Sequence, residues 1–486
     1  MRLLRKYNGS FLKTMHVIIA FCFYFQAIAQ NNIQTIFNEL KNHPDLKNAS
    51  IGFYAYNMDD NKELININGD LALIPASTLK LITTATALEI LGKDYTFQTK
   101  IAYSGTVENG ILNGNIYIIG GGDPALGSHR YSSFYGDFLE QWKSSVQSLG
   151  IDSINGQIIG DASIFDNEIP PTWIWQDLGN YFGAGANGLS IYENFYYLHL
   201  SSTNGVSITD IQPKIPQLKI ENYLNAGSTH RDLSYIYGGP YQYNRYISGE
   251  IPNNKNRFTV KGSIPDPAFL CAYQLDSLLK INGVNICLPP TTLRLSPQKV
   301  AHPLTEITST QSPSLASIIS QTNLYSINLY AEHLLNHIGL KIKNKGGFDA
   351  GIEAIIEFWK SKGIDMDGMN LHDGSGLSRF NTLTTKQLSA ILQYMAKSTN
   401  HDVFEQSLAV AGKTGTLRSM AQNTSAEGKI IGKSGYMTNV RSYAGYIKTK
   451  SNKKAVFAII VNNYNCTAFE MKKILEKVLI GLTNEN

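Results

Sequence analysis

The sequence predicts an α/β (α+β) protein in which an antiparallel sheet is flanked by helices and a large β-rich segment is inserted into the chain. Three stretches support this prediction. Two short apolar runs joined by a polar turn follow residue 50, and a second such pair, followed by a helical pattern, closes the chain. Between them lie about 200 residues of short strand patterns separated by Gly, Asn, Pro and Ser.

The first strand pair is expected at residues 51–57 and 63–67, with a polar turn between the strands. An amphipathic helix over residues 31–46 should precede it, and a long apolar helix should run from Ser77 to a stop at Gly92. The N-terminal part of the main domain therefore covers residues 30–96.

Residues 97–297 form the predicted β-rich insert, which is long enough for two subdomains. Strand patterns at residues 112–119 and 154–161 are examples. The second part of the main domain covers residues 298–486. Its expected helices span 314–320, 329–338, 348–362, 385–397 and 468–482, and its expected strands include 443–447 and 455–461.

Composition narrows the classes of function. The 486 residues carry a formal net charge of +4 and only 16% charged residues, which gives no basic field suited to nucleic acid. A neutral or polymeric substrate fits better.

Residues 1–29 have the order of a secretory signal peptide: basic residues, an apolar run, then small residues before Gln30. We expect cleavage after Ala29 and export, with the periplasm as the destination. An uncleaved membrane anchor is the alternative, but the apolar run is shorter than the ~20 residues that a span needs.

Three cysteines remain after the leader, at positions 271, 287 and 466. They permit one disulfide, and Cys271 with Cys287 is the pair closest in sequence; whether the two are joined stays open. No CxxC occurs, and the sequence predicts neither a metal nor a cofactor.

The pattern Ser77-Thr78-Leu79-Lys80 indicates a nucleophile with its base. Residues three apart share one face of a helix, so the lysine amine can take the proton of the serine hydroxyl. Ser10 and Lys13 have the same spacing but lie in the leader. The alternative for Ser77 is a helix N-cap, a position that favours serine.

A serine nucleophile also needs a proton carrier for the leaving group and a cation for a substrate carboxylate. Ser326 and Asn328 lie at a predicted junction between two helices and could supply the proton carrier. The Ser-x-Asn pattern also occurs at Ser153, Ser202 and Ser398.

Two lysines compete as the cationic anchor. Lys413-Thr414-Gly415 precedes a polar stretch, whereas Lys433-Ser434-Gly435 opens a predicted strand from Tyr436 to Ile447. A carboxylate-binding lysine needs a rigid strand edge beside the nucleophile, so we choose Lys433.

In this order, Ser-x-x-Lys, Ser-x-Asn and Lys-Ser-Gly resemble the three motifs of penicillin-recognising serine enzymes. The large insert narrows the resemblance to the D-alanyl-D-alanine carboxypeptidase/endopeptidase family of type-4 penicillin-binding proteins. The segments 121–124, 160–165 and 373–379 match that family as well. The resemblance covers nearly all of the mature chain and implies a β-lactamase/transpeptidase-like main domain.

The resemblance implies a role for each motif residue. Lys80 would deprotonate Ser77, Ser326 would pass a proton to the leaving amine, and Asn328 would bind the substrate amide and steady Lys80. Lys80 would have to be neutral, its pKa lowered by burial and by the neighbouring Lys433 charge.

Lys433, Ser434 and Gly435 would face the substrate carboxylate or crosslink, and the N–H groups of Ser77 and Tyr436 would form the oxyanion hole. Ser434 replaces the usual threonine. Tyr436 replaces the Thr or Ser common at the next position, which affects how the carboxylate is held.

The predicted function is a serine DD-peptidase that cleaves D-Ala-D-Ala termini, and potentially crosslinks, of peptidoglycan, with β-lactams as covalent inhibitors. A serine β-lactamase and a non-catalytic cell-wall-binding protein are the alternatives. Peptidoglycan stem peptides are the expected partners, and a homodimer is one potential assembly.

Other candidate residues carry weaker signals. Trp173, Trp175 and Asp177 could line a pocket for the peptide stem, although a structural core or turn is favoured. His333 and His337 have the spacing of a helical zinc pair, but position 334 is Leu where HExxH needs Glu, so we expect them on an ordinary helix surface.

Overall fold

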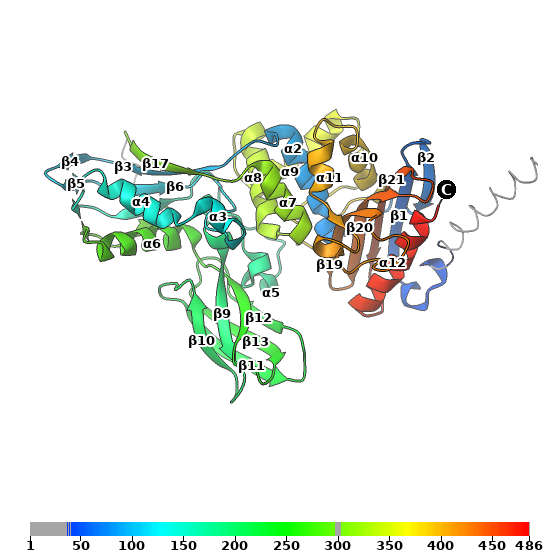
Figure 1. The fold of residues 1–486 in the computed structure, drawn as a ribbon, viewed down its shortest axis with the longest axis horizontal. Helices are drawn as coiled ribbons and strands as arrows, with labels where there is room; N and C mark the ends of the chain where they lie inside the picture. The colour runs from blue at the N-terminus through cyan, green and yellow to red at the C-terminus, as the bar shows by residue number, and fades with distance from the viewer. Residues whose placement is uncertain (1–35, 37, 39, 297–302, 486) are drawn as a thin grey trace, which may run out of the picture. The chain divides into compact units, whose positions relative to one another are not determined.

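The computed structural model describes residues 36, 38, 40–296 and 303–485 (Figure 1). The predicted signal peptide and most of the predicted helix over residues 31–46 lie outside these residues. The chain divides into two compact units, residues 1–78, 382–397 and 408–486, and residues 79–381 and 398–407. The predicted domain boundaries at residues 97 and 297 stay a prediction.

The first unit is built on a six-stranded antiparallel sheet (Figure 1). Its strands, in spatial order, are β18 (Ala409–Val410), β19 (Ile430–Met437), β20 (Val440–Lys448), β21 (Lys454–Asn462), β1 (Ser50–Asn57) and β2 (Lys62–Ile67). The first predicted hairpin is β1 with β2, and β20 with β21 is the second. Pairing of β1 with β21 joins the two ends of the chain in one sheet.

Two helices cover this sheet, α10 (Thr385–Met395) against β21 and β1 and α12 (Ala468–Thr483) against β20. Every residue of β21 from Ala455 to Asn462 is buried. A strand buried on both faces reads as a continuous apolar run, which is the sequence pattern at this position. The hydroxyl of Tyr446 on β20 donates to the carbonyl of Leu392 on α10 at 2.9 Å and fastens the helix to the sheet.

The second unit contains a group of helices that carries several of the candidate catalytic residues. They are α2 (Lys80–Leu91), α7 (Leu315–Tyr325), α8 (Asn328–Lys343), α9 (Phe348–Ser361) and α11 (His401–Gln406). Helix α2 packs on α7, α8 and α9 and is buried over most of its length. Trp359 on α9 donates from Nε1 to the Thr86 hydroxyl at 2.8 Å within this core.

The same unit contains four small sheets. Their strands are β16 (Thr291–Thr292), β8 (Ile158–Asp161), β6 (Ile116–Ile119), β3 (Gln98–Tyr103) and β17 (Thr305–Gln311); β15 (Asn285–Ile286), β7 (Ser153–Ile154), β5 (Ile111–Asn113) and β4 (Thr106–Glu108); β10 (Ser207–Gln212), β9 (Phe195–Ser201) and β14 (Phe258–Ser263); and β11 (Lys219–Gly227), β13 (Asn244–Pro252) and β12 (Leu233–Tyr237). The strand pattern expected between residues 97 and 297 is therefore present.

Helices occur among these strands as well, and the strand pattern did not predict them. The longer two are α4 (Phe138–Gln147) and α6 (Pro267–Ile281), and α3 (Ser132–Tyr135) and α5 (Trp175–Leu178) are single turns. The start of α6 has a recognisable signal: Asp266 caps the helix by accepting from the Phe269 N–H at 3.0 Å, and Pro267 occupies its first turn.

All three cysteines are unpaired: Cys271 is buried, Cys287 is exposed and Cys466 is intermediate. The structure therefore contains no bond between Cys271 and Cys287. Among residues 36–485 that are described, no helix has the length and apolar character needed to cross a membrane.

Candidate active site

Ser77 lies in the first unit, in the 3₁₀ turn Ala76–Leu79 that leads into α2. The N-cap of α2 is Leu79, so Ser77 does not cap that helix. Ala76 has φ +47°, an uncommon conformation for a residue with a Cβ. The turn is braced by the Pro75 carbonyl, which accepts from the hydroxyls of Thr78 at 2.8 Å and Ser442 at 2.5 Å.

Lys433-Ser434-Gly435 lies within β19, and this differs from the prediction. We expected the motif to open a strand from Tyr436 to Ile447, but the chain turns at residues 438–439 and that range spans parts of β19 and β20. The turn is formed by the polar pair Thr438-Asn439, in which Asn439 has φ +61°, a conformation that asparagine tolerates.

Gly435 brings β19 against the Ser77 turn. A Cβ at this position would lie 2.6 Å from the Pro75 carbonyl oxygen and 3.0 Å from the Ser77 nitrogen. Only glycine allows this approach of the two backbones. The motif Lys433-Ser434-Gly435 is thus in direct contact with the turn that carries Ser77.

The two candidate anchor lysines differ in environment. Lys433 is fully buried, and its Nζ donates to the Ser434 carbonyl at 3.0 Å. Lys413 is exposed in a turn after β18. Tyr436, next to the motif, is 55% exposed, and the Arg441 guanidinium lies 5.6 Å from the centre of its ring.

Lys80 is the first residue of α2 and belongs to the second unit. Its side chain is fully buried, and Nζ donates to Asn328 Oδ1 at 2.7 Å and to the Ser375 carbonyl at 2.6 Å. Burial lowers the pKa of Lys80 to about 7, while the Asp373 and Glu332 charges act in the opposite direction. A large fraction of this amine is therefore neutral near pH 7.

Ser326 and Asn328 lie where α7 ends and α8 begins. Ser326 is the C-cap of α7 with φ +60°, and Asn328 is the first residue of α8. The Asn328 side chain accepts from Lys80 through Oδ1 and donates from Nδ2 to the Phe182 carbonyl at 2.8 Å. These two bonds fix the orientation of its amide.

Glu332 is a neighbour of this site that the sequence reasoning missed. It follows Asn328 by one helical turn, and that spacing places both on one face of α8. Both carboxylate oxygens accept from the Gly374 N–H at 3.1 Å. Burial, with Asp373 nearby, raises the pKa of Glu332 to about 8.

The loop 373–378 holds the acceptor for Lys80. Asp373 accepts from the N–H groups of Gly376 at 2.7 Å and Ser378 at 2.6 Å, and from Trp173 Nε1 at 2.8 Å. These bonds, with the one from Gly374 to Glu332, place the Ser375 carbonyl against Lys80. The sequence linked this segment to the family resemblance without indicating a role for it, because a backbone carbonyl acceptor leaves no residue-type signal.

The tryptophans near Asp177 have different environments. Trp173 is buried against Asp373, whereas Trp175 is 49% exposed. Burial raises the pKa of Asp177 to about 6, and the Arg379 charge acts to lower it.

His333 and His337 are buried, so their predicted place on a helix surface is wrong. His333 Nδ1 and His337 Nε2 lie 2.8 Å and 3.1 Å from the Gly122 carbonyl oxygen. Helix α8 is buried along several faces, and its polar residues bond to loops that its own sequence does not reveal. No group of three or more metal-ligating side chains occurs in the described part of the chain.

Comparisons with known proteins give relatives that match most of the chain. The chain is 26% identical over 441 residues to a D-alanyl-D-alanine carboxypeptidase of Actinomadura sp. (strain R39), a match that covers 87% of this chain and 79% of the relative. It is 24% identical to the carboxypeptidase DacB of Haemophilus influenzae, over 87% and 88% of the two chains. The crystal structure of penicillin binding protein 4 (dacB) from Haemophilus influenzae has the same fold, with a TM-score of 0.79 and 22% identity over 93% of this chain and 99% of that chain.

These findings confirm the predicted α/β (α+β) fold and the resemblance to type-4 penicillin-binding proteins. The model of one family matches residues 32–483, which is nearly the whole chain. The chain therefore belongs to the D-Ala-D-Ala carboxypeptidase 3 (S13) family and is a serine-type hydrolase.

Proposed function

We propose that Ser77 is the nucleophile of this D-Ala-D-Ala peptidase and that Lys80 is its general base. The observation that carries the proposal is the state of Lys80: buried, bonded to two neutral oxygens, with its pKa lowered to about 7. An amine in that state can accept the hydroxyl proton of a serine three residues earlier in the chain. Lys80 takes the proton as Ser77 Oγ bonds to the carbonyl carbon between the two terminal D-alanines.

The remaining motif residues complete the reaction in this proposal. The N–H groups of Ser77 and Tyr436 stabilise the oxyanion, and a donor of this kind typically contributes ~2.7–4 kcal/mol to the transition state. Ser326 delivers a proton to the amine of the leaving D-alanine as the peptide bond breaks. Water then hydrolyses the ester on Ser77 and regenerates the free enzyme.

Asn328 binds the substrate amide, and Lys433 with Ser434 faces the terminal carboxylate. The support for Lys433 over Lys413 is its burial and the contact of Gly435 with the Ser77 turn. Tyr436 stands next to this motif where a Thr or Ser is common, which changes how a free carboxylate is held, so peptidoglycan crosslinks are a second substrate to test.

β-Lactams are the expected covalent inhibitors because they present an acylating carbonyl beside a carboxylate. A second structure of the Haemophilus influenzae protein, described as complexed with a novel β-lactam, matches this chain with a TM-score of 0.71. Peptidoglycan stem peptides are the natural substrates. Trp175, Asp177 and Arg379 offer one aromatic ring and two opposite charges that could contact the stem.

Export to the periplasm and assembly into a homodimer remain proposals as well. N-terminal sequencing of the mature protein from fractionated cells should start at Gln30. Light scattering on purified protein gives the oligomeric state.

Labelling with a fluorescent penicillin, followed by mass mapping, tests the proposed roles. We expect label on Ser77, its loss in Ser77→Ala, a strong reduction in Lys433→Ala and wild-type labelling in the control Lys413→Ala. A folded wild-type protein that takes no label would refute the acyl-enzyme mechanism. Equal labelling of the two lysine variants would refute the assignment of Lys433.

A further inference from the structure

A cavity of about 270 Å³ lies in the second unit, apart from the residues assigned to catalysis. It opens where the parallel strands β8 and β16 end, beside the first turn of α6. The carboxyl ends of parallel strands are a common place for ligand sites, because the loops that follow can converge there. Polar side chains on its wall include Ser163, Asn187, Tyr241 and Arg294.

Tyr241 is held at this cavity in an unusual backbone conformation. Its φ is +62°, and a left-handed conformation is a genuine outlier for a bulky residue. The Tyr241 N–H donates to the Pro265 carbonyl at 2.9 Å and keeps the residue in place. Strain of this kind persists only where the surrounding structure enforces it, and it concentrates at binding sites.

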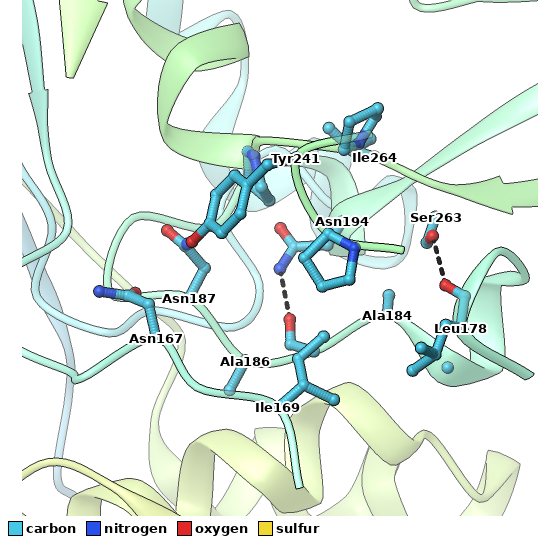
Figure 2. A pocket seen from close by; sticks show the side chains of 15 residues that line it. Asn167, Ile169, Leu178, Ala184, Ala186, Asn187, Asn194, Tyr241, Ser263 and Ile264 are labelled. Carbon is cyan, nitrogen blue, oxygen red and sulfur yellow. Dashed lines mark hydrogen bonds between the residues drawn. The ribbon is translucent and has the colours of Figure 1, made fainter. Parts of the chain in front are cut away.

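Tyr241 also lines a second, smaller cavity. The second cavity, of about 30 Å³, shares Tyr241, Asn167 and Asn187 with the first and is otherwise lined in part by Ile169 and Ala186. Figure 2 shows Tyr241, Asn187 and Asn167 next to one another at one side of this space. The smaller cavity has room for about one water molecule or one methyl group.

The charges at the larger cavity are largely matched. The Arg294 guanidinium lies 3.8 Å from the centre of the Tyr241 ring and pairs with Asp266 at 2.8 Å. The same Asp266 caps α6, so the helix N-terminus is satisfied as well. The other ionisable side chain on the wall is the exposed Asp166, and no excess positive charge is present to hold a phosphate.

We propose that the two cavities bind one N-acetylated amino sugar of the glycan strand, a proposal that rests on the peptidoglycan function above. A neutral pyranose presents hydroxyl and amide groups that match the amide, hydroxyl and guanidinium groups of the larger cavity. The methyl group of the acetamido substituent fits the smaller one against Ile169 and Ala186. No covalent step is involved.

Such a site would raise the local concentration of stem peptides at the catalytic residues. Tethering through a second contact on the same polymer makes the next encounter intramolecular. The effect should therefore appear with polymeric peptidoglycan and be absent with a short soluble peptide.

Calorimetric titration of the full mature protein with di-N-acetylchitobiose tests the site. Tyr241→Gly removes the ring, and glycine accepts the left-handed conformation without strain. We expect binding to wild type and a Kd raised by roughly tenfold or more in the variant. Asn254→Gly is the matched control, because Asn254 is exposed in the same unit with φ +54°; its binding should equal that of wild type.

Hydrolysis of a short D-Ala-D-Ala peptide, measured in parallel, separates this proposal from the proposed function. Tyr241→Gly should hydrolyse that peptide at the wild-type rate and digest purified sacculi more slowly. If the wild-type protein binds the sugar but does not hydrolyse the peptide, the peptidase mechanism is refuted and the sugar site stands. Absence of sugar binding in wild type, or unchanged binding in Tyr241→Gly, overturns the sugar site. If Tyr241→Gly does not fold, Tyr241→Asn, which also tolerates this conformation, gives the same decision.

Discussion

Acylation of Ser77 should slow by about tenfold for each pH unit below about 7, because Lys80 accepts a proton only as a neutral amine. With its pKa lowered to about 7, roughly half of the Lys80 amines are neutral at pH 7 and roughly one per cent at pH 5. The rate at pH 5 should therefore be about 50-fold below that at pH 7. The carboxyl groups of Glu332 and Asp373 act on Lys80 from α8 and from loop 373–378.

Stopped-flow measurement of the second-order acylation rate with a chromogenic β-lactam, from pH 5 to pH 10, tests this expectation. The rate should level off above pH 8. Intrinsic fluorescence at each pH checks that the protein stays folded, and Lys413→Ala serves as a control with the wild-type profile. A rate that still rises tenfold per unit between pH 8 and pH 10 would show an ordinary lysine, with no lowering of its pKa by burial. A flat profile from pH 5 to pH 7 would show that Lys80 is not the base.

The same shift has a consequence for stability. The pKa of Lys80 in the folded state lies below its ordinary value of 10.5, so between pH 7 and pH 10 the unfolded chain binds more protons. The free energy of unfolding should rise with pH across that window, by up to ~1.4 kcal/mol per unit. Lys80→Met should remove this rise, which thermal unfolding of both proteins from pH 8 to pH 10 can show. Parallel pH dependence in the two proteins would contradict the shift.

Three further changes have defined outcomes. Gly435→Ala should abolish most acylation and lower the free energy of unfolding by about 1–3 kcal/mol, because its Cβ would lie 2.6 Å from a backbone oxygen. Gly239→Ala is the control, because the nearest atom to its Cβ would lie 3.4 Å away. Penicillin labelling and thermal unfolding of this control should be close to wild type. Trp359→Phe should lower the free energy of unfolding by about 1–3 kcal/mol, because it removes the buried hydrogen bond to Thr86 and part of the ring. Denaturant unfolding measures this change. An unchanged denaturant midpoint would show that the hydrogen bond contributes nothing. The melting temperature of Glu332→Gln should rise relative to that of wild type as pH increases from 5 to 8. The folded-state pKa of Glu332, about 8, exceeds the ordinary value of 4.5, so wild type loses stability over that window. A constant difference in melting temperature between the two proteins would contradict the raised pKa.

Local sequence patterns were sufficient to predict many of the helices and strands, because each pattern arises from interactions between residues that are near one another in the chain. Alternating or continuous apolar runs with polar turns predicted β1 with β2 and β20 with β21, and α12 follows at its expected place. Helix α6 was missed within a strand-rich region although its capping residue Asp266 and Pro267 signal a start. The expected strand from Tyr436 to Ile447 was wrong, because the polar pair Thr438-Asn439 forms a turn that divides this range between β19 and β20.

The amino-acid sequence alone determined which chemical groups this protein carries and their order in the chain, a serine with a lysine three residues later and then the later motifs, because a motif is a local pattern of residue types. Only the tertiary structure decided how those groups behave. The burial of Lys80, its bond to the Ser375 carbonyl and the contact of Gly435 with the Ser77 turn join residues about 300 or more positions apart. The low pKa of Lys80 comes from the removal of water around it, a property of packing that no short stretch of sequence contains.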